Sequence, residues 1–170
     1  DAVEGLAAQS GRYCQLVCEE HGLAAALQST RWVPDQGTRP SQRAYPQRAR
    51  LHTNAPGKAI LAHLTDERLT EILDQHGLPA RTDQTVTDEE ALRGELATIA
   101  EQGYAVDRGE LIRGMVGVAA PVATRETVYG AVAAYGPASE VRPARDGDLP
   151  ELVADTADDI RADIVFAGSE

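Results

Sequence analysis

Two carboxylates three positions apart, Asp107 and Glu110, follow an apolar run and are the residues best suited to chemistry. Such a pair can serve as general acid and base, or as two ligands of a metal ion. No further residue nearby completes either kind of site, and the four histidines and two cysteines lack the spacing of a zinc site. We therefore expect no metal and no cofactor, and a solvated loop is the default interpretation of this pair.

Nucleophilic catalysis has little support in the sequence. A nucleophile needs a neighbouring base and donors for an oxyanion. Ser29, Ser41 and Ser139 fall in predicted loops without a nucleophile elbow, and Cys14 and Cys18 lack a histidine in a dyad pattern. The sequence therefore predicts that the chain is not an enzyme, and a metabolic enzyme acting on small acids is kept as an alternative.

The segment Asn54-Ala55-Pro56-Gly57-Lys58 predicts the start of a helix, with Asn54 as its cap. It is not a phosphate-binding loop, because the upstream glycine and the hydroxyl residue after Lys58 are absent. Backbone N–H groups at a helix start can face a pocket and attract a carboxylate. Pro56 offers no N–H, so a helix start with no ligand is the other interpretation.

Composition limits the partners of the chain. The formal net charge is −11, and a single lysine, Lys58, accompanies fifteen arginines. An acidic surface repels phosphate backbones, so this segment is not expected to contact DNA itself. The same composition suits a halophilic cytoplasm, although a GC-rich genome would also favour arginine. No apolar run approaches the ~20 residues of a membrane span, and we expect a cytoplasmic protein.

Apolar residues at helical spacing predict five helices. Three have clear start or stop signals: Gly11 ends the first, Thr65 caps the third, and Thr87 with Glu90 forms a capping box for the fourth. The expected ranges are 2–9, 57–64, 66–76, 88–102 and 146–166.

Strands are predicted where apolar and β-branched residues lie between turn signals. The expected ranges are 12–20 and 23–28, which form a hairpin, then 104–107, 115–122 and 128–135, with a short edge strand at 43–45. Cys14 and Cys18 lie too far apart along one strand for a disulfide and are expected to be small buried residues. Strands, helices, then strands and a closing helix indicate an α+β domain with an antiparallel sheet.

Several of these segments together resemble the effector-binding domain of IclR-type transcriptional regulators. The resemblance spans roughly Leu6 to Ala167, and it implies a GAF-like domain of the α+β class. It rests on the run Leu51–Ala59, on Gly103–Asp107 with Glu110 and Gly114, on Ala119-Ala120-Pro121, and on Tyr135-Gly136-Pro137.

The resemblance also implies a set of ligand-binding residues. In the family, backbone groups at the helix start contact the effector, which carries over to Ala55 and Pro56. An aspartate at the end of a strand faces the pocket, which carries over to Asp107, whereas Glu110 is expected to hold the loop.

Two neighbouring strands are expected to complete the pocket. By family position, the side chains that point inward are those of Met115, Gly117, Ala133 and Tyr135. Family members that bind two- or three-carbon acids carry Cys in place of Gly117, and Ser in place of Ala133 and Tyr135. Losing these polar groups predicts a more apolar pocket for a larger or more aromatic ligand. Core residues without any ligand are the alternative.

Residues 1–170 are thus interpreted as a single effector-binding and oligomerisation domain of a DNA-binding regulator. The chain begins at Asp1, and the resemblance implies that a winged helix-turn-helix lies N-terminal to it and makes all DNA contacts. The expected partners are a small organic or aromatic acid and further copies of the chain, as dimer or tetramer. A dimerisation module with a vestigial pocket is the second interpretation.

Overall fold

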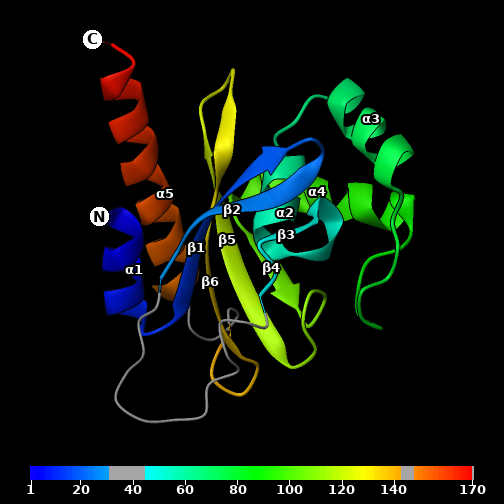
Figure 1. Cartoon of the computed structure of the whole chain (residues 1–170), viewed down its shortest axis with the longest axis horizontal. Coiled ribbons are helices and arrows are strands. Elements are labelled where there is room, and N and C mark those ends of the chain that lie inside the picture. Colours follow the sequence, from blue (N-terminus) through cyan, green and yellow to red (C-terminus); the bar gives the residue numbers. More distant parts are fainter. Residues whose placement is uncertain (31–44, 143–147, 170) are drawn as a thin grey trace.

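A curled antiparallel sheet of six strands forms the centre of the computed structural model, which describes residues 1–30, 45–142 and 148–169. The strand order is β3-β2-β1-β6-β5-β4 (Figure 1). The strands are β1 (Tyr13–Glu20), β2 (Leu23–Ser29), β3 (Arg48–Arg50), β4 (Ala105–Arg108), β5 (Met115–Ala123) and β6 (Val128–Pro137). The middle of the sheet therefore joins the first hairpin of the chain to the last three strands.

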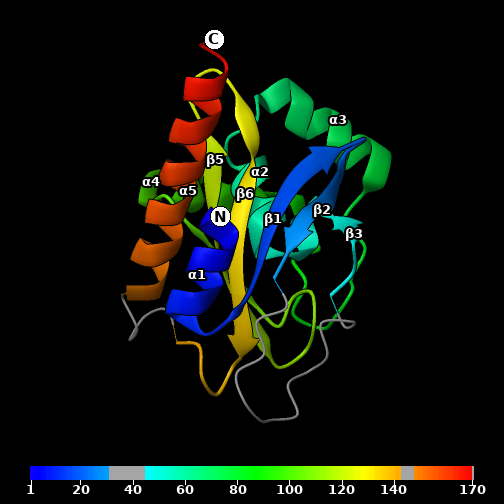
Figure 2. The ribbon, with the colours of Figure 1, turned by 60° about the vertical axis from the view of Figure 1, so that its left-hand side comes forward.

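Helices cover both faces of this sheet. On one face, called the outer face here, α1 and α5 lie side by side (Figure 2). On the other, the inner face, α2 packs on β5 and β6 and against α4. The helices are α1 (Ala2–Ser10), α2 (Ala55–Leu61), α3 (Asp66–His76), α4 (Glu89–Gln102) and α5 (Asp148–Ala167), with a 3-10 turn at Leu51–Thr53.

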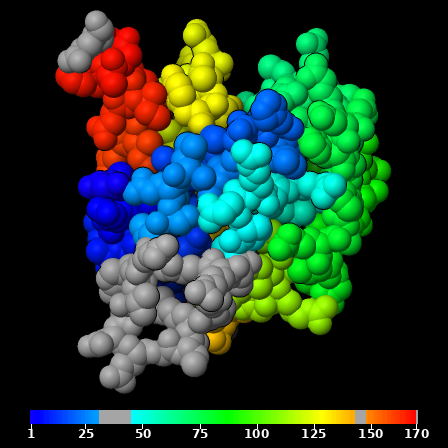
Figure 3. All heavy atoms as spheres, in the orientation of Figure 1, coloured from blue at the N-terminus to red at the C-terminus, as the bar shows by residue number. Residues whose placement is uncertain are grey.

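Strand alternation divides the core into two apolar clusters. The inner cluster includes Met115, Ala133 and Tyr135, and the outer cluster includes Val116, Val118 and Ala134 with residues of α1 and α5. Beyond the packed sheet, the turn between β5 and β6 and the end of α5 project from the same side of the molecule (Figure 3). None of the described helices is long and apolar enough to cross a membrane.

Three of the expected helix boundaries are confirmed, one by a backbone cap and two by side-chain caps. Gly11 ends α1 at a φ of 66°, a left-handed conformation that favours glycine. Asn54 accepts from the Gly57 N–H at the start of α2, and Thr65 accepts from the Arg68 N–H at the start of α3.

Other boundaries need correction. The fourth helix is capped by Asp88, which accepts from Ala91 N–H, and not by Thr87. Asp88 is the last residue with extended backbone before the helix, and its carboxylate reaches an N–H group of the first turn that has no partner within the helix. Helix α2 ends at Leu61, three residues before the predicted end at residue 64. Residues 62–64 form a turn and a bend instead.

The edge strand was also misplaced. It lies at Arg48–Arg50, where it pairs with β2, whereas Tyr45 is a bend and residues 43 and 44 lie outside the described residues. The predicted start of the last helix, 146–147, lies outside them as well. Cys14 is buried as expected, but Cys18 is only half-buried, and both thiols are free.

Candidate functional site

One cross-strand row on the inner face brings together the residues that the sequence singled out. Asp107 of β4 lies opposite Gly117 of β5, and Gly117 lies opposite Tyr135 of β6. The row continues to Tyr13 of β1, which pairs with Tyr135. Directly opposite residues in a sheet have neighbouring side chains, so the carboxylate and the two phenols form one continuous surface.

Gly117 leaves the space that the ring of Tyr135 occupies. A Cβ atom built on Gly117 would lie 2.3 Å from Cε1 of that ring, far inside van der Waals contact. The position where a larger side chain would stand on β5 is therefore filled from β6. Any ligand in this part of the inner face must either displace the Tyr135 ring or lie beside it.

A third tyrosine, which the sequence reasoning missed, completes an aromatic group. The ring of Tyr45 stacks on that of Tyr13, with centroids 4.8 Å apart and planes at 19°, and it lies 4.8 Å from Tyr135 at 51°. We call Tyr13, Tyr45 and Tyr135 the tyrosine cluster. The chain has only seven aromatic residues other than histidine, so three of the seven gather at this point.

Two hydroxyl groups of the cluster find no partner among the residues that the structure describes. The hydroxyls of Tyr45 and Tyr135 are buried and form no hydrogen bond within the described part of the chain. Burial, and then the charge of Asp107, raises the pKa of both phenols. The Ala55 N–H lies near enough to the Tyr135 hydroxyl to lower its pKa, without reaching hydrogen-bond geometry. Such groups ordinarily find a partner, so they mark a place where a ligand or water fits.

The cavity beside the cluster is small. Its volume is about 20 Å³, and its lining includes Gln15, Asn54, Pro56, Leu111 and Tyr135. This space is close to that of one water molecule. The inner face as described is thus packed, and an organic ligand needs a rearrangement of aromatic side chains.

Asp107 is buried and holds the loop that follows β4. One carboxylate oxygen accepts from the Glu110 N–H at 2.7 Å. Burial, followed by the charge of Glu110, raises the pKa of Asp107 to about 7, against the opposing effects of the Glu110 N–H and the Lys58 ammonium. A raised pKa brings the protonated form of this carboxyl group within reach near neutral pH, and in that form it can donate a hydrogen bond.

Lys58 is the main residue of this region to which the sequence analysis assigned no role. Its side chain is completely buried, and its ammonium group donates to Glu110 at 2.7 Å, to the Val106 carbonyl at 2.8 Å and to Glu95. The second carboxylate oxygen of Glu110 accepts from the Arg108 N–H. This network connects α2 to the loop after β4. It therefore holds the start of the helix at a fixed position relative to Asp107.

All seven residues expected in the pocket are buried. Ala55, Met115, Ala133 and Tyr135 belong to the inner cluster, Pro56 lines the small cavity, and Asp107 and Gly117 lie in the cross-strand row. At the helix start, Asn54 already uses the Gly57 N–H. A role for the backbone of Ala55 and Pro56 in ligand binding stays a prediction. Within the described residues, no three His, Cys, Asp or Glu side chains gather as a metal site.

The architecture matches a known regulator domain. The family model for the bacterial transcriptional regulator IclR C-terminal domain matches residues 2–162. This chain belongs to the IclR family. The GAF-like fold implied by the resemblance is confirmed by the Thermotoga maritima IclR structure, which matches with a TM-score of 0.85 at 22% identity over 96% of this chain and 65% of that one.

Relatives of this IclR domain are transcriptional regulators. A probable HTH-type transcriptional regulator ArcR from Halobacterium salinarum is 31% identical over 159 residues, which is 92% of this chain and 60% of the relative. The repressor AllR of Escherichia coli K12 is 36% identical over 111 residues, 65% of this chain and 41% of AllR. The chain thus spans about 60% or less of the length of these relatives.

Solved structures that match this chain include complexes with hydroxybenzoates. The protein from Microbacterium hydrocarbonoxydans, complexed with 4-hydroxybenzoate, matches with a TM-score of 0.77 at 25% identity, over 95% of this chain and 64% of that one.

Proposed function

We propose that this domain is the sensor of an IclR-type transcriptional regulator and binds an aromatic acid at the tyrosine cluster. The observation that carries the proposal is the pair of buried hydroxyls of Tyr45 and Tyr135 beside Asp107, which have no hydrogen-bond partner among the described residues. Aromatic rings favour stacking with another ring, and free hydroxyls bind a carboxylate or a phenol. The 4-hydroxybenzoate complex of the Microbacterium homologue supports this ligand class.

Ligand binding at this place requires exchange of one ring for another. The cavity of about 20 Å³ is several times too small for a benzoate-sized molecule. A ligand ring that replaces the Tyr45 or Tyr135 ring in the stack restores most of the lost apolar contact. An aliphatic acid of two or three carbons has no such surface, so the cluster favours aromatic ligands.

No lysine or arginine side chain lines the small cavity among the described residues. Lys58 is already held by two carboxylates. A bound carboxylate would therefore be held by hydroxyl and amide donors. The Gln15 amide, which now donates to the Tyr13 hydroxyl at 3.1 Å and to the Ser29 hydroxyl, would turn an N–H group toward the ligand. A phenol group on the ligand would suit Asp107.

We also propose that the domain forms dimers or tetramers and that the effector changes their geometry, and so the action of a DNA-binding segment elsewhere in the regulator. Among the described residues, four large apolar side chains are exposed and available for such contacts: Leu27, Tyr129, Val165 and Phe166. Light scattering across a protein dilution series, with and without ligand, tests this. A monomer throughout would contradict it.

A thermal-shift screen tests the sensor proposal. Benzoate, 4-hydroxybenzoate, pyruvate, glyoxylate and neutral sugars are compared in molar potassium chloride. A ligand at a hundred times its Kd adds about 2.7 kcal/mol to the unfolding free energy. We expect a saturable shift for aromatic acids alone, and a smaller one for Tyr45→Phe. A well-folded domain with no shift from any compound would favour the dimerisation module with a vestigial pocket.

A further inference from the structure

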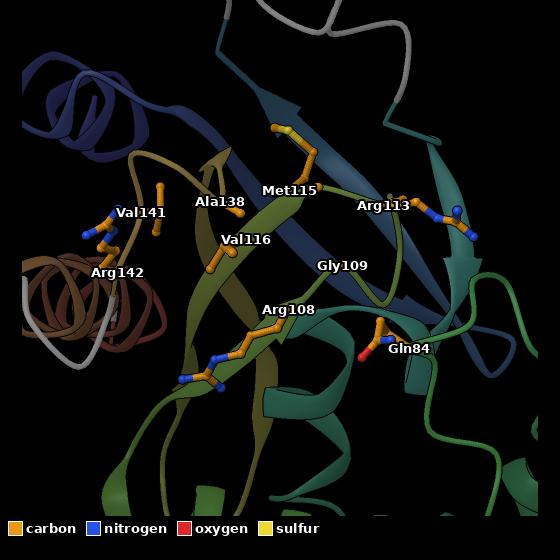
Figure 4. A pocket seen from close by; sticks show the side chains of 10 residues that line it. Gln84, Arg108, Gly109, Arg113, Met115, Val116, Ala138, Val141 and Arg142 are labelled. Atoms are coloured by element: carbon orange, nitrogen blue, oxygen red, sulfur yellow. The ribbon is translucent and has the colours of Figure 1, made fainter.

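A second, larger hollow lies at the end of the sheet, outside the inner core. Its volume is about 550 Å³, and Figure 4 shows residues from three segments around it. Val116 and Val141 form its apolar floor with Ala138, and Arg108, Arg113 and Gln84 stand around it. We call this hollow the Arg108 groove.

The floor of the groove follows from one sheet register. Arg108 of β4 lies opposite Val116 of β5, and Val116 lies opposite Gly136 of β6. A Cβ atom at Gly136 would lie 2.7 Å from Cγ2 of Val141, so the missing side chain allows Val141 to lie on the sheet. The groove row is one residue out of step with Asp107, Gly117 and Tyr135, and it therefore faces the opposite side.

The Arg108 guanidinium supplies a positive charge at the groove. The Arg108 side chain is exposed and makes no hydrogen bond or ion pair with the described residues. By contrast Arg113, which points away from Arg108 in Figure 4, pairs with Asp83 at 3.5 Å. None of the described residues that line the groove is Asp or Glu, in a chain with 27 acidic residues. An unpaired guanidinium beside an apolar floor attracts an anion that also has an apolar part.

We propose that the Arg108 groove binds a small amphipathic carboxylate, with its apolar body on Val116, Ala138 and Val141 and its carboxylate on Arg108. The floor of this site is distinct from the tyrosine cluster, because Val116 and Val141 belong to the outer apolar cluster, whereas Tyr135 and Tyr45 belong to the inner one. Met115 of the inner cluster also lines the groove. The proposal therefore goes beyond effector binding at the inner face. Arg108 directly follows Asp107, so a ligand held by Arg108 touches the segment that shapes the inner site.

The test uses octanoate as the probe and octan-1-ol as its neutral counterpart. Titrations are followed by the methyl NMR signals of Val116, Val141 and Ala138, and of Ala133 on the inner face. Arg108→Gln removes the guanidinium, and Ala138→Glu adds a carboxylate at an exposed position. Arg125→Gln is the matched control, because Arg125 is exposed in the turn between β5 and β6, at the far end of the hairpin.

We expect octanoate to shift the groove methyls with saturation. Arg108→Gln and Ala138→Glu should each weaken binding about tenfold or more, whereas Arg125→Gln should leave it unchanged. Equal affinity for octan-1-ol, equal binding by Arg108→Gln, shifts confined to Ala133, or no saturable shift would each overturn the proposal. Failure of the sensor proposal is a separate result: it would be the absence of a thermal shift with aromatic acids, or an equal shift in Tyr45→Phe.

Discussion

The ring of Tyr135 occupies the space above Gly117, where a Cβ atom would lie 2.3 Å from Cε1. The two residues are directly opposite each other on β5 and β6, so neither can be enlarged independently. This relation explains why the inner face holds a cavity of only about 20 Å³ although Ala105, Ala119 and Ala133 on β4, β5 and β6 carry small side chains. The size of the site depends on one side chain that crosses from the neighbouring strand.

Gly117→Ala should therefore lower the unfolding free energy by about 1–3 kcal/mol through overpacking. In a Tyr135→Ala background the same change should be nearly neutral, because the clashing ring is gone. Urea denaturation of the four proteins measures this coupling. Gly94→Ala is the control: it lies exposed within α4 with no atom near its Cβ, and should stabilise by ~0.5–1 kcal/mol. Equal costs for Gly117→Ala in both backgrounds would contradict the prediction.

Lys58→Met should destabilise the domain by about 3–5 kcal/mol, because it leaves Glu110 buried without its counter-ion. The double change Lys58→Met with Glu110→Gln should recover part of that loss. Chemical denaturation measures both. Arg93→Gln serves as control, since Arg93 forms exposed ion pairs with Asp66 and Glu89 and its loss should change stability far less than that of Lys58. A Lys58 variant as stable as the wild type would refute the structural role.

Asp107 predicts a specific pH dependence. Its pKa of about 7 in the folded state lies above the usual 3.8, so the folded state binds the proton more tightly. Its contribution to stability is full below about pH 4 and is lost as the pH rises to about 7.

The comparison is with Asp107→Asn, which keeps an acceptor for the Glu110 N–H. Between about pH 4 and 7, wild type should lose stability relative to this variant by an amount on the order of 1–4 kcal/mol. His52, whose pKa is lowered by burial, acts equally in both proteins. Melting temperatures over this range test it, and parallel curves would count against a raised pKa.

Tyr45→Phe should leave stability unchanged or raise it by up to about 1 kcal/mol, because the lost hydroxyl has no partner in the described protein. Thr85→Val is a useful contrast, since the buried Thr85 hydroxyl donates to the Glu110 carbonyl at 2.8 Å. That change should cost about 1–3 kcal/mol. Thermal unfolding compares them, and a large loss for Tyr45→Phe would reveal a partner for that hydroxyl.

The charge of −11 predicts that salt stabilises the domain. Raising potassium chloride from about 0.1 M to about 2 M should screen the repulsion among carboxylates and move the urea midpoint upward. Potassium sulfate, matched in ionic strength, separates screening from general salting-out effects. Unfolding at molar potassium chloride would contradict salt adaptation.

Much of the fold could be predicted because its signals are local. Gly11, Asn54 and Thr65 act on backbone groups within three or four residues, and alternation along β5 and β6 marks both faces of the sheet. The edge strand at Arg48–Arg50 could not be predicted from its own residues. Three residues carry too little periodicity, and their place depends on pairing with β2.

The site was harder to predict because its contacts are distant in sequence. Lys58 meets Glu95 and Glu110, 37 and 52 positions later, and no local pattern marks a buried ion pair. The one available signal was composition, since a lone lysine stands among fifteen arginines. The place of Tyr45 in the tyrosine cluster could not be predicted, because no other aromatic residue lies next to it in the sequence. Its stacking partners lie on β1 and β6.

The burial of Lys58 also determines how the folded protein reacts with amine-directed reagents. Because the only lysine of the sequence is wholly enclosed by the fold, the native surface carries no side-chain primary amine. Acylating enzymes, amine-coupled sensor chips and lysine-directed cross-linkers would find no lysine to modify until the domain opens. The rate at which an amine reagent modifies the Nζ atom of Lys58 therefore reports directly on the rate of opening of the domain.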